Sequence, residues 1–123
     1  MDPSFLNNFW KVAIIVIILD FIWIAGFLLD QIKPMIARVQ NEPMVVKPFS
    51  VIMAYVILIA LFTIMISKTN SIEEAFIIGF LTYAVYDSTN YATLKNWNLP
   101  LAVIDSLWGG VLFASTYYIL SPL

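Results

Sequence analysis

Three aspartates interrupt apolar stretches of the chain that are long enough to cross a membrane. Asp20, Asp87 and Asp105 each stand within a run of predominantly apolar residues, and roughly twenty such residues span a bilayer as a helix. At about 1.5 Å per residue, their depths from the face that holds the chain ends are roughly 16, 18 and 22 Å. A charge near the bilayer centre costs ~2.5–3.5 kcal/mol or more. We therefore expect the three side chains to turn away from lipid and to meet.

Two tryptophans are spaced to hydrogen-bond to these acids. Trp23 follows Asp20 by three residues, and Trp108 follows Asp105 by three residues; positions three apart share a helix face. An indole N–H can only donate a hydrogen bond, and a carboxylate oxygen can only accept one. We predict reciprocal pairs between the first and last membrane helices, Trp108 with Asp20 and Trp23 with Asp105.

Further polar and small residues surround the predicted cluster. Tyr83 and Asn90 share a helix face with Asp87 and are expected to support it. In contrast, Tyr55 and Thr63, alone in an apolar stretch, are interpreted as structural residues of a helix that faces lipid. Glycines beside the Asp–Trp pairs would let two helix backbones approach closely. These are Gly26, Gly109 and Gly110.

The elements that must position these residues are four apolar helices. The predicted membrane spans are residues 9–29, 49–67, 75–94 and 99–120. Continuous apolar runs indicate helices, because membrane strands alternate over about ten residues. The fold class is therefore an all-α membrane protein, a single-domain four-helix bundle with its first and last helices antiparallel and in contact. Within the long connection 30–48, residues 32–39 are amphipathic and are expected to lie on the membrane surface, and Ser71 with Glu74 predicts a capped start of the third helix.

The composition supports a membrane protein and excludes several functions. Of the 123 residues, 62% are hydrophobic and 11% are charged, with a net charge of −2. So small a soluble domain could not bury that much apolar surface, and nucleic-acid binding by a basic patch is excluded. The absence of cysteine and histidine excludes disulfides, thiolate nucleophiles and ordinary zinc sites. We expect no cofactor.

The basic residues suggest an orientation. Four of them, Lys33, Arg38, Lys47 and Lys95, fall in the first and third connections, and two, Lys11 and Lys68, fall at the other face. Because lysine and arginine are enriched in cytoplasmic loops, we expect connections one and three in the cytoplasm and both termini outside. The expected partner is the lipid bilayer, with self-association or a membrane partner subunit left open.

Three segments resemble a known family. Residues 19–23 read LDFIW, residues 86–97 read YDSTNYATLKNW and residues 103–109 read VIDSLWG. They are similar to the motifs of the membrane protein family catalogued as domain of unknown function 2177, over nearly the whole chain. The resemblance implies a four-helix membrane protein and marks the residues that the depth argument selects. It implies no activity.

Three functions remain open from the sequence. The first is relay or transport of a proton or small cation by the acidic cluster, because membrane pathways use protonatable acids. The second is a structural or assembly role as a scaffold, a partner subunit or a virion membrane component. The third, least favoured, is an intramembrane enzyme acting on lipid, in which Asp20, Asp87 and Asp105 would hold a metal ion.

Overall fold

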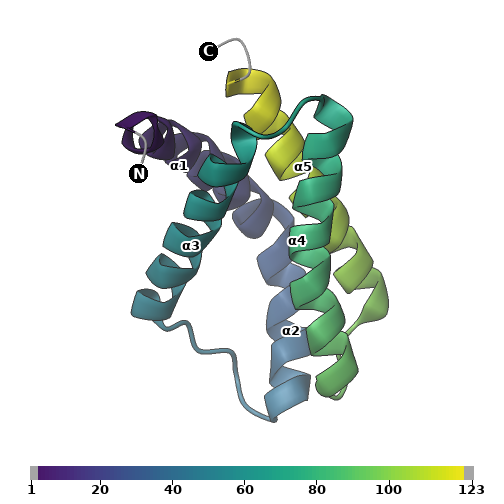
Figure 1. The fold of residues 1–123 in the computed structure, drawn as a ribbon. Helices are drawn as coiled ribbons and strands as arrows, with labels where there is room; N and C mark the ends of the chain where they lie inside the picture. The colour runs from purple at the N-terminus through teal and green to yellow at the C-terminus, as the bar shows by residue number, and fades with distance from the viewer. Residues whose placement is uncertain (1–2, 121–123) are drawn as a thin grey trace.

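The computed structural model describes residues 3–120, and every regular element within them is a helix. The elements in chain order are α1 (Pro3–Trp23), the π-helical segment η1 (Ile24–Leu28), α2 (Leu29–Gln40), α3 (Pro48–Ile66), α4 (Ile72–Thr93) and α5 (Leu99–Leu120). The start of α1 and the end of α5 lie at one end of the molecule, and the connections after α2 and α4 lie at the other (Figure 1). This arrangement supports alternating passage through a membrane.

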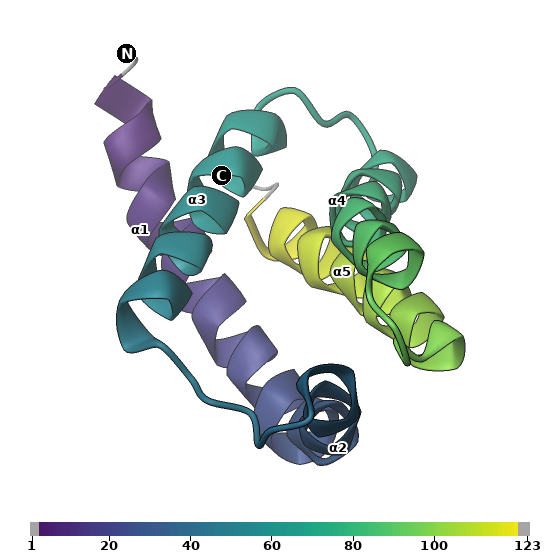
Figure 2. The same cartoon turned by 90° about the horizontal axis from the view of Figure 1, so that it is seen from below.

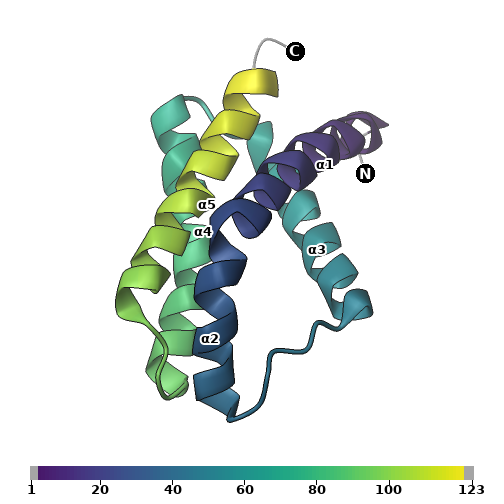
Figure 3. The same ribbon diagram turned by 180° about the vertical axis from the view of Figure 1, so that it is seen from behind.

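The first helix is longer than the sequence indicates. We expected it to end at Leu29, but α1, η1 and α2 follow one another without a break as far as Gln40. The direction of the helix changes at η1 (Figures 1 and 3), as is common where a π-helical turn interrupts an α-helix. Asn41, in the left-handed conformation at φ 59°, ends α2.

The expectation that residues 32–39 lie on the membrane surface is wrong. Met35 of α2 is fully buried and forms a second hydrophobic cluster with Trp97, Leu101 and Ala102, at the start of α5 and just before it. The amphipathic stripe of α2 therefore covers protein rather than lipid head groups. That packing also explains why the helix continues through Pro34, since one missing backbone hydrogen bond is offset by burial of the stripe.

Helices α4 and α5 form the most closely packed pair (Figure 2). A Cβ atom at Gly79 would lie 2.1 Å from the Gly109 carbonyl oxygen, and one at Gly110 would lie 2.7 Å from the Phe76 ring. The close approach of α4 and α5 therefore depends on the absence of side chains at these glycines.

The starts of α4 and α5 are capped: Ser71 Oγ accepts the Glu74 N–H at 3.1 Å, as predicted, and Asn98 Oδ1 accepts the Leu101 N–H at 3.1 Å.

The main hydrophobic core lies toward the chain ends. It joins α1, α3, α4 and α5, and the Phe62 ring of α3 stacks on the Phe113 ring of α5 at 4.3 Å. The opposite end of α3 stands apart from α2 (Figures 1 and 3). This divergence opens a cavity between the helices.

Within residues 3–120, three helical segments are long and apolar enough to cross a membrane: Ser4–Gln40, Pro48–Ile66 and Leu99–Leu120. Helix α4 has the length, at 22 residues, but its second half contains Asp87, Ser88, Thr89 and Asn90. Many large apolar side chains elsewhere point outward; Phe21 and Val85 are each 68% exposed. Such a surface is expected of a protein that contacts hydrocarbon.

Candidate functional site

Asp20 of α1 is held by donors from two other helices. Its side chain is only 5% exposed. The Tyr55 hydroxyl of α3 donates to Oδ2, and the Trp108 indole N–H of α5 donates to Oδ1 at 2.8 Å. Each carboxylate oxygen thus has a donor, and the two bonds join α1, α3 and α5 at a single point.

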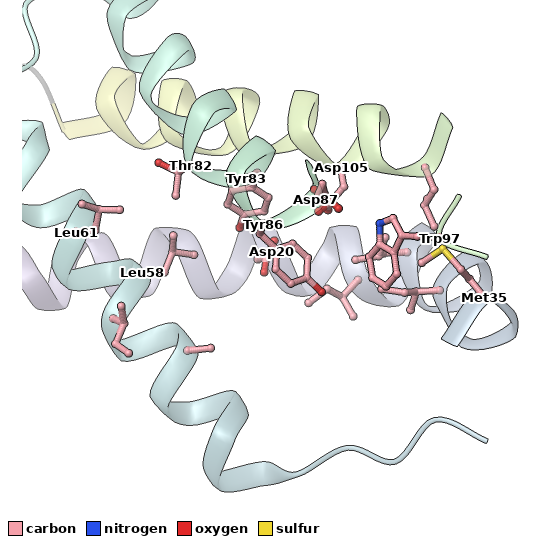
Figure 4. Close-up of a pocket in the computed structure, with 16 residues that line it drawn as sticks. Asp20, Met35, Leu58, Leu61, Thr82, Tyr83, Tyr86, Asp87, Trp97 and Asp105 are labelled. Carbon is pink, nitrogen blue, oxygen red and sulfur yellow. The ribbon is translucent and has the colours of Figure 1, made fainter. Parts of the chain in front are cut away.

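Asp87 of α4 and Asp105 of α5 form a second acidic unit. Both are buried, and the carboxyl groups face each other (Figure 4). Asp87 Oδ2 has no hydrogen-bond partner among the described residues. The nearby Ser106 hydroxyl donates to the Ala102 carbonyl at 2.8 Å. Among the described residues, Asp87 therefore has one carboxyl oxygen without a donor, whereas both oxygens of Asp20 are paired.

The predicted reciprocal pairing is formed on one side only. Trp108 donates to Asp20, whereas the buried Trp23 Nε1 faces Asp105 without completing a hydrogen bond within residues 3–120. The two indole rings stack instead, with centroids 5.0 Å apart and planes inclined by 7°. This stacking is a further contact between α1 and α5, and it leaves a second donor beside the acids.

Other predicted site residues have different surroundings. Tyr83 lies on the cavity wall near all three aspartates and packs against Gly109, where a Cβ would be 2.4 Å from its Cγ. Asn90 instead faces Tyr86. Gly26 does not support close packing, because a Cβ there would meet nothing within 4 Å. Gly109 and Gly110 do, but their contacts are with α4 rather than with the first helix.

Tyr55 is a site residue that the sequence interpretation missed. We interpreted it as structural on a helix facing lipid, yet its hydroxyl donates to Asp20. The available indication was its place as one of few polar residues in α3, about seven residues from the start of that helix, which is roughly 10 Å of rise. Because α3 begins at the face opposite the chain ends, Tyr55 is then roughly 20 Å from the face with the chain ends for a core of roughly 30 Å, level with the acids.

The three aspartates line one cavity of about 500 Å³ between α1, α2, α3, α4 and α5 (Figure 4). Its other described lining residues are apolar or aromatic apart from Thr82, and none is basic. Aliphatic side chains of α3 form one wall, and Tyr83, Tyr86 and Trp97 contribute aromatic surface. The site is thus an acidic patch inside an apolar cavity.

No three acidic side chains within residues 3–120 are grouped closely enough to hold a metal ion. The hypothesis of a metal shared by Asp20, Asp87 and Asp105 is therefore not supported in the described part of the chain. A proton needs only two facing carboxyl groups, and this requirement is met by Asp87 and Asp105.

Comparison with known proteins agrees with the resemblance found from the sequence motifs. A family model described as "Predicted membrane protein (DUF2177)" matches residues 5–120. No curated protein and no solved structure matches the chain.

Proposed function

The chain belongs to the DUF2177 family of predicted membrane proteins, and we propose that its buried aspartates relay a proton across the bilayer. In this proposal the chain crosses the membrane four times, by α1–α2, α3, α4 and α5, with the first and last crossings antiparallel. In α4, Asp87 lines the cavity, whereas Ser88 and Thr89 are exposed. Asp20, Asp87 and Asp105 then lie at mid-membrane depth.

The observation that carries the proposal is the unpartnered Asp87 Oδ2 opposite Asp105. Two carboxylates that face each other in a buried site repel strongly unless they share a proton or a cation. None of the described cavity residues is a lysine or arginine. One proton held between the two carboxyl groups supplies the hydrogen bond that Oδ2 lacks, and this proton can be exchanged.

Hydroxyl groups extend the pathway from the pair. Asp105 interacts with Asp20 as well as with Asp87, and the Tyr55 hydroxyl contacts Asp20. Hydroxyl and carboxyl groups can each give and receive a proton, so they can carry it in steps when cavity water joins them. The cavity provides space for such water beside all three acids.

Proton flux in proteoliposomes tests the proposal. With a pH-sensitive dye inside and an imposed pH gradient, the unaltered protein should dissipate the gradient faster than empty liposomes. Asp87→Asn should lower flux to the background of empty liposomes while the protein remains folded, because an amide cannot release a proton. Asp30→Asn, at an exposed acid outside the cavity, is the matched control and should conduct normally. Normal flux in Asp87→Asn would refute the relay.

An assembly role is the second candidate, and the state of Asp20 favours it. This carboxylate has both oxygens paired with donors from other helices, as expected of a residue that only joins helices. If assembly is the whole function, Asp87→Asn should be tolerated, and purification from the native membrane should yield a partner at fixed stoichiometry.

We also propose the sidedness expected from the charges. Lys47 and Lys95 lie in the α2–α3 and α4–α5 connections, and Lys33 and Arg38 lie in α2, which leads to the first of them. Positive charge favours the cytoplasm. The ends of the chain would then face outward.

A further inference from the structure

The cavity is larger than a proton relay requires. Its volume of about 500 Å³ falls within the ~300–1,000 Å³ typical of sites for small organic molecules. Among the described lining residues, charge comes only from the three aspartates, and the remainder of the wall is almost entirely apolar or aromatic. A ligand that matches this wall carries positive charge and hydrocarbon.

Two side chains that line the cavity each carry an unpartnered polar atom, and these atoms indicate the head group of such a ligand. Asp87 Oδ2 is an acceptor on a side chain that is 3% exposed, and Trp97 Nε1 is a donor on a side chain that is 7% exposed. Neither has a hydrogen-bond partner among the described residues, and both side chains line the cavity (Figure 4). Buried polar atoms without partners are costly. A ligand with both a donor and an acceptor would satisfy the two.

The opposite wall accommodates a chain. Residues of α3 such as Ala54, Ile57 and Leu58 present apolar surface to the cavity, and Ile57 is 63% exposed. Because the cavity wall is exposed at Ile57, a hydrocarbon chain can enter from the bilayer beside α3. The head group can then reach the acids without crossing water.

We propose that this cavity binds a membrane-dissolved amphiphile with a primary ammonium group, an adjacent hydroxyl or carbonyl oxygen, and a single hydrocarbon chain. Asp87 and Asp105 accept from the ammonium, Trp97 donates to the oxygen, and α3 covers the chain. The inference rests on the proposed function in one respect: the ammonium displaces the proton held between Asp87 and Asp105. Anionic amphiphiles are excluded by charge.

Binding to the full-length protein in phosphatidylcholine nanodiscs tests the inference, with radiolabelled 2-aminododecan-1-ol as the probe. Uptake above that of empty nanodiscs should saturate at one molecule per chain, and dodecanoate should not compete. Asp87→Asn should weaken binding at least about tenfold, because a charged hydrogen bond is lost. Asp30→Asn should leave it unchanged. Trp97→Phe should weaken binding of the amino alcohol but not of dodecylamine, which lacks the oxygen.

Two further measurements keep the test decisive. Ala54→Phe narrows the cavity without altering an acid, so it should abolish binding of the amphiphile. Unsaturable uptake, equal competition by dodecanoate, or undiminished binding in both Asp87→Asn and Ala54→Phe would overturn the amphiphile site. Loss of the site with Asp87-dependent flux intact would leave the relay standing. Specific binding without any flux would reject the relay alone.

Discussion

The crossing of α4 and α5 at Gly79 and Gly109 allows a quantitative test of the packing. A methyl group at Gly109 would lie 2.4 Å from Tyr83 Cγ and 2.6 Å from the Gly79 carbonyl oxygen. Ordinary contacts between carbon atoms begin near ~3.5 Å, so the helices would have to separate by about 1 Å. One neighbour is backbone and cannot rotate away. Gly109→Ala should therefore lower the free energy of unfolding by about 1–3 kcal/mol, the usual cost of overpacking.

The matched control is the same change at Gly26, where a Cβ would meet nothing within 4 Å. Gly26→Ala should leave stability unchanged or raise it by up to about 1 kcal/mol, because alanine favours a helix over glycine. Both variants can be compared by denaturant unfolding in mild detergent, followed by circular dichroism. If Gly109→Ala is as stable as Gly26→Ala, the close crossing is wrong, and with it the support that Tyr83 gives the site.

Two other perturbations address the hydrogen bonds and the orientation. Tyr55→Phe and Trp108→Phe should each lower the free energy of unfolding by about 1 kcal/mol. The double variant should lose more than the sum of the two single losses, since it leaves Asp20 with neither donor. Additive losses would contradict a shared role of the two donors at Asp20. The chain has no cysteine, so Asn41→Cys and Lys68→Cys can be labelled singly with an impermeant maleimide in oriented cells. Asn41→Cys should react only from the cytoplasm and Lys68→Cys only from outside, and the opposite pattern would reverse the proposed topology.

The level of a residue along a helix bundle can be predicted from the sequence because helix rise is constant. Asp20 and Trp108 meet as expected, as do Asp87 and Asp105, since both pairs follow from counting residues inward from the membrane faces. The rotation of a helix about its own axis is harder to predict from the sequence. Helix α3 is apolar on all sides, so no stripe of polar residues shows that Tyr55 turns toward Asp20 rather than toward lipid.

The length of the first helix could not be predicted for a different reason. Pro34 and the charges after Asp30 are typical of a loop, but whether a helix continues depends on what its next turn can bury. Met35 packs with Trp97 and Leu101, which lie more than sixty positions later in the chain. The change of direction at η1 brings α2 against these residues. The sequence of η1 contains no proline, and Gly26 is its one indication of a bend.

Asp20 and the Asp87–Asp105 pair differ in how their carboxyl oxygens are paired. If all three acids only joined helices, each would be expected to have its oxygens paired, because an unpaired buried carboxyl oxygen weakens the fold. Asp20 meets that expectation, and Asp87 does not. An asparagine at position 87 would carry no charge and would offer two donors. An acid there gains nothing for packing, which is why we propose a proton or an ammonium group as its partner.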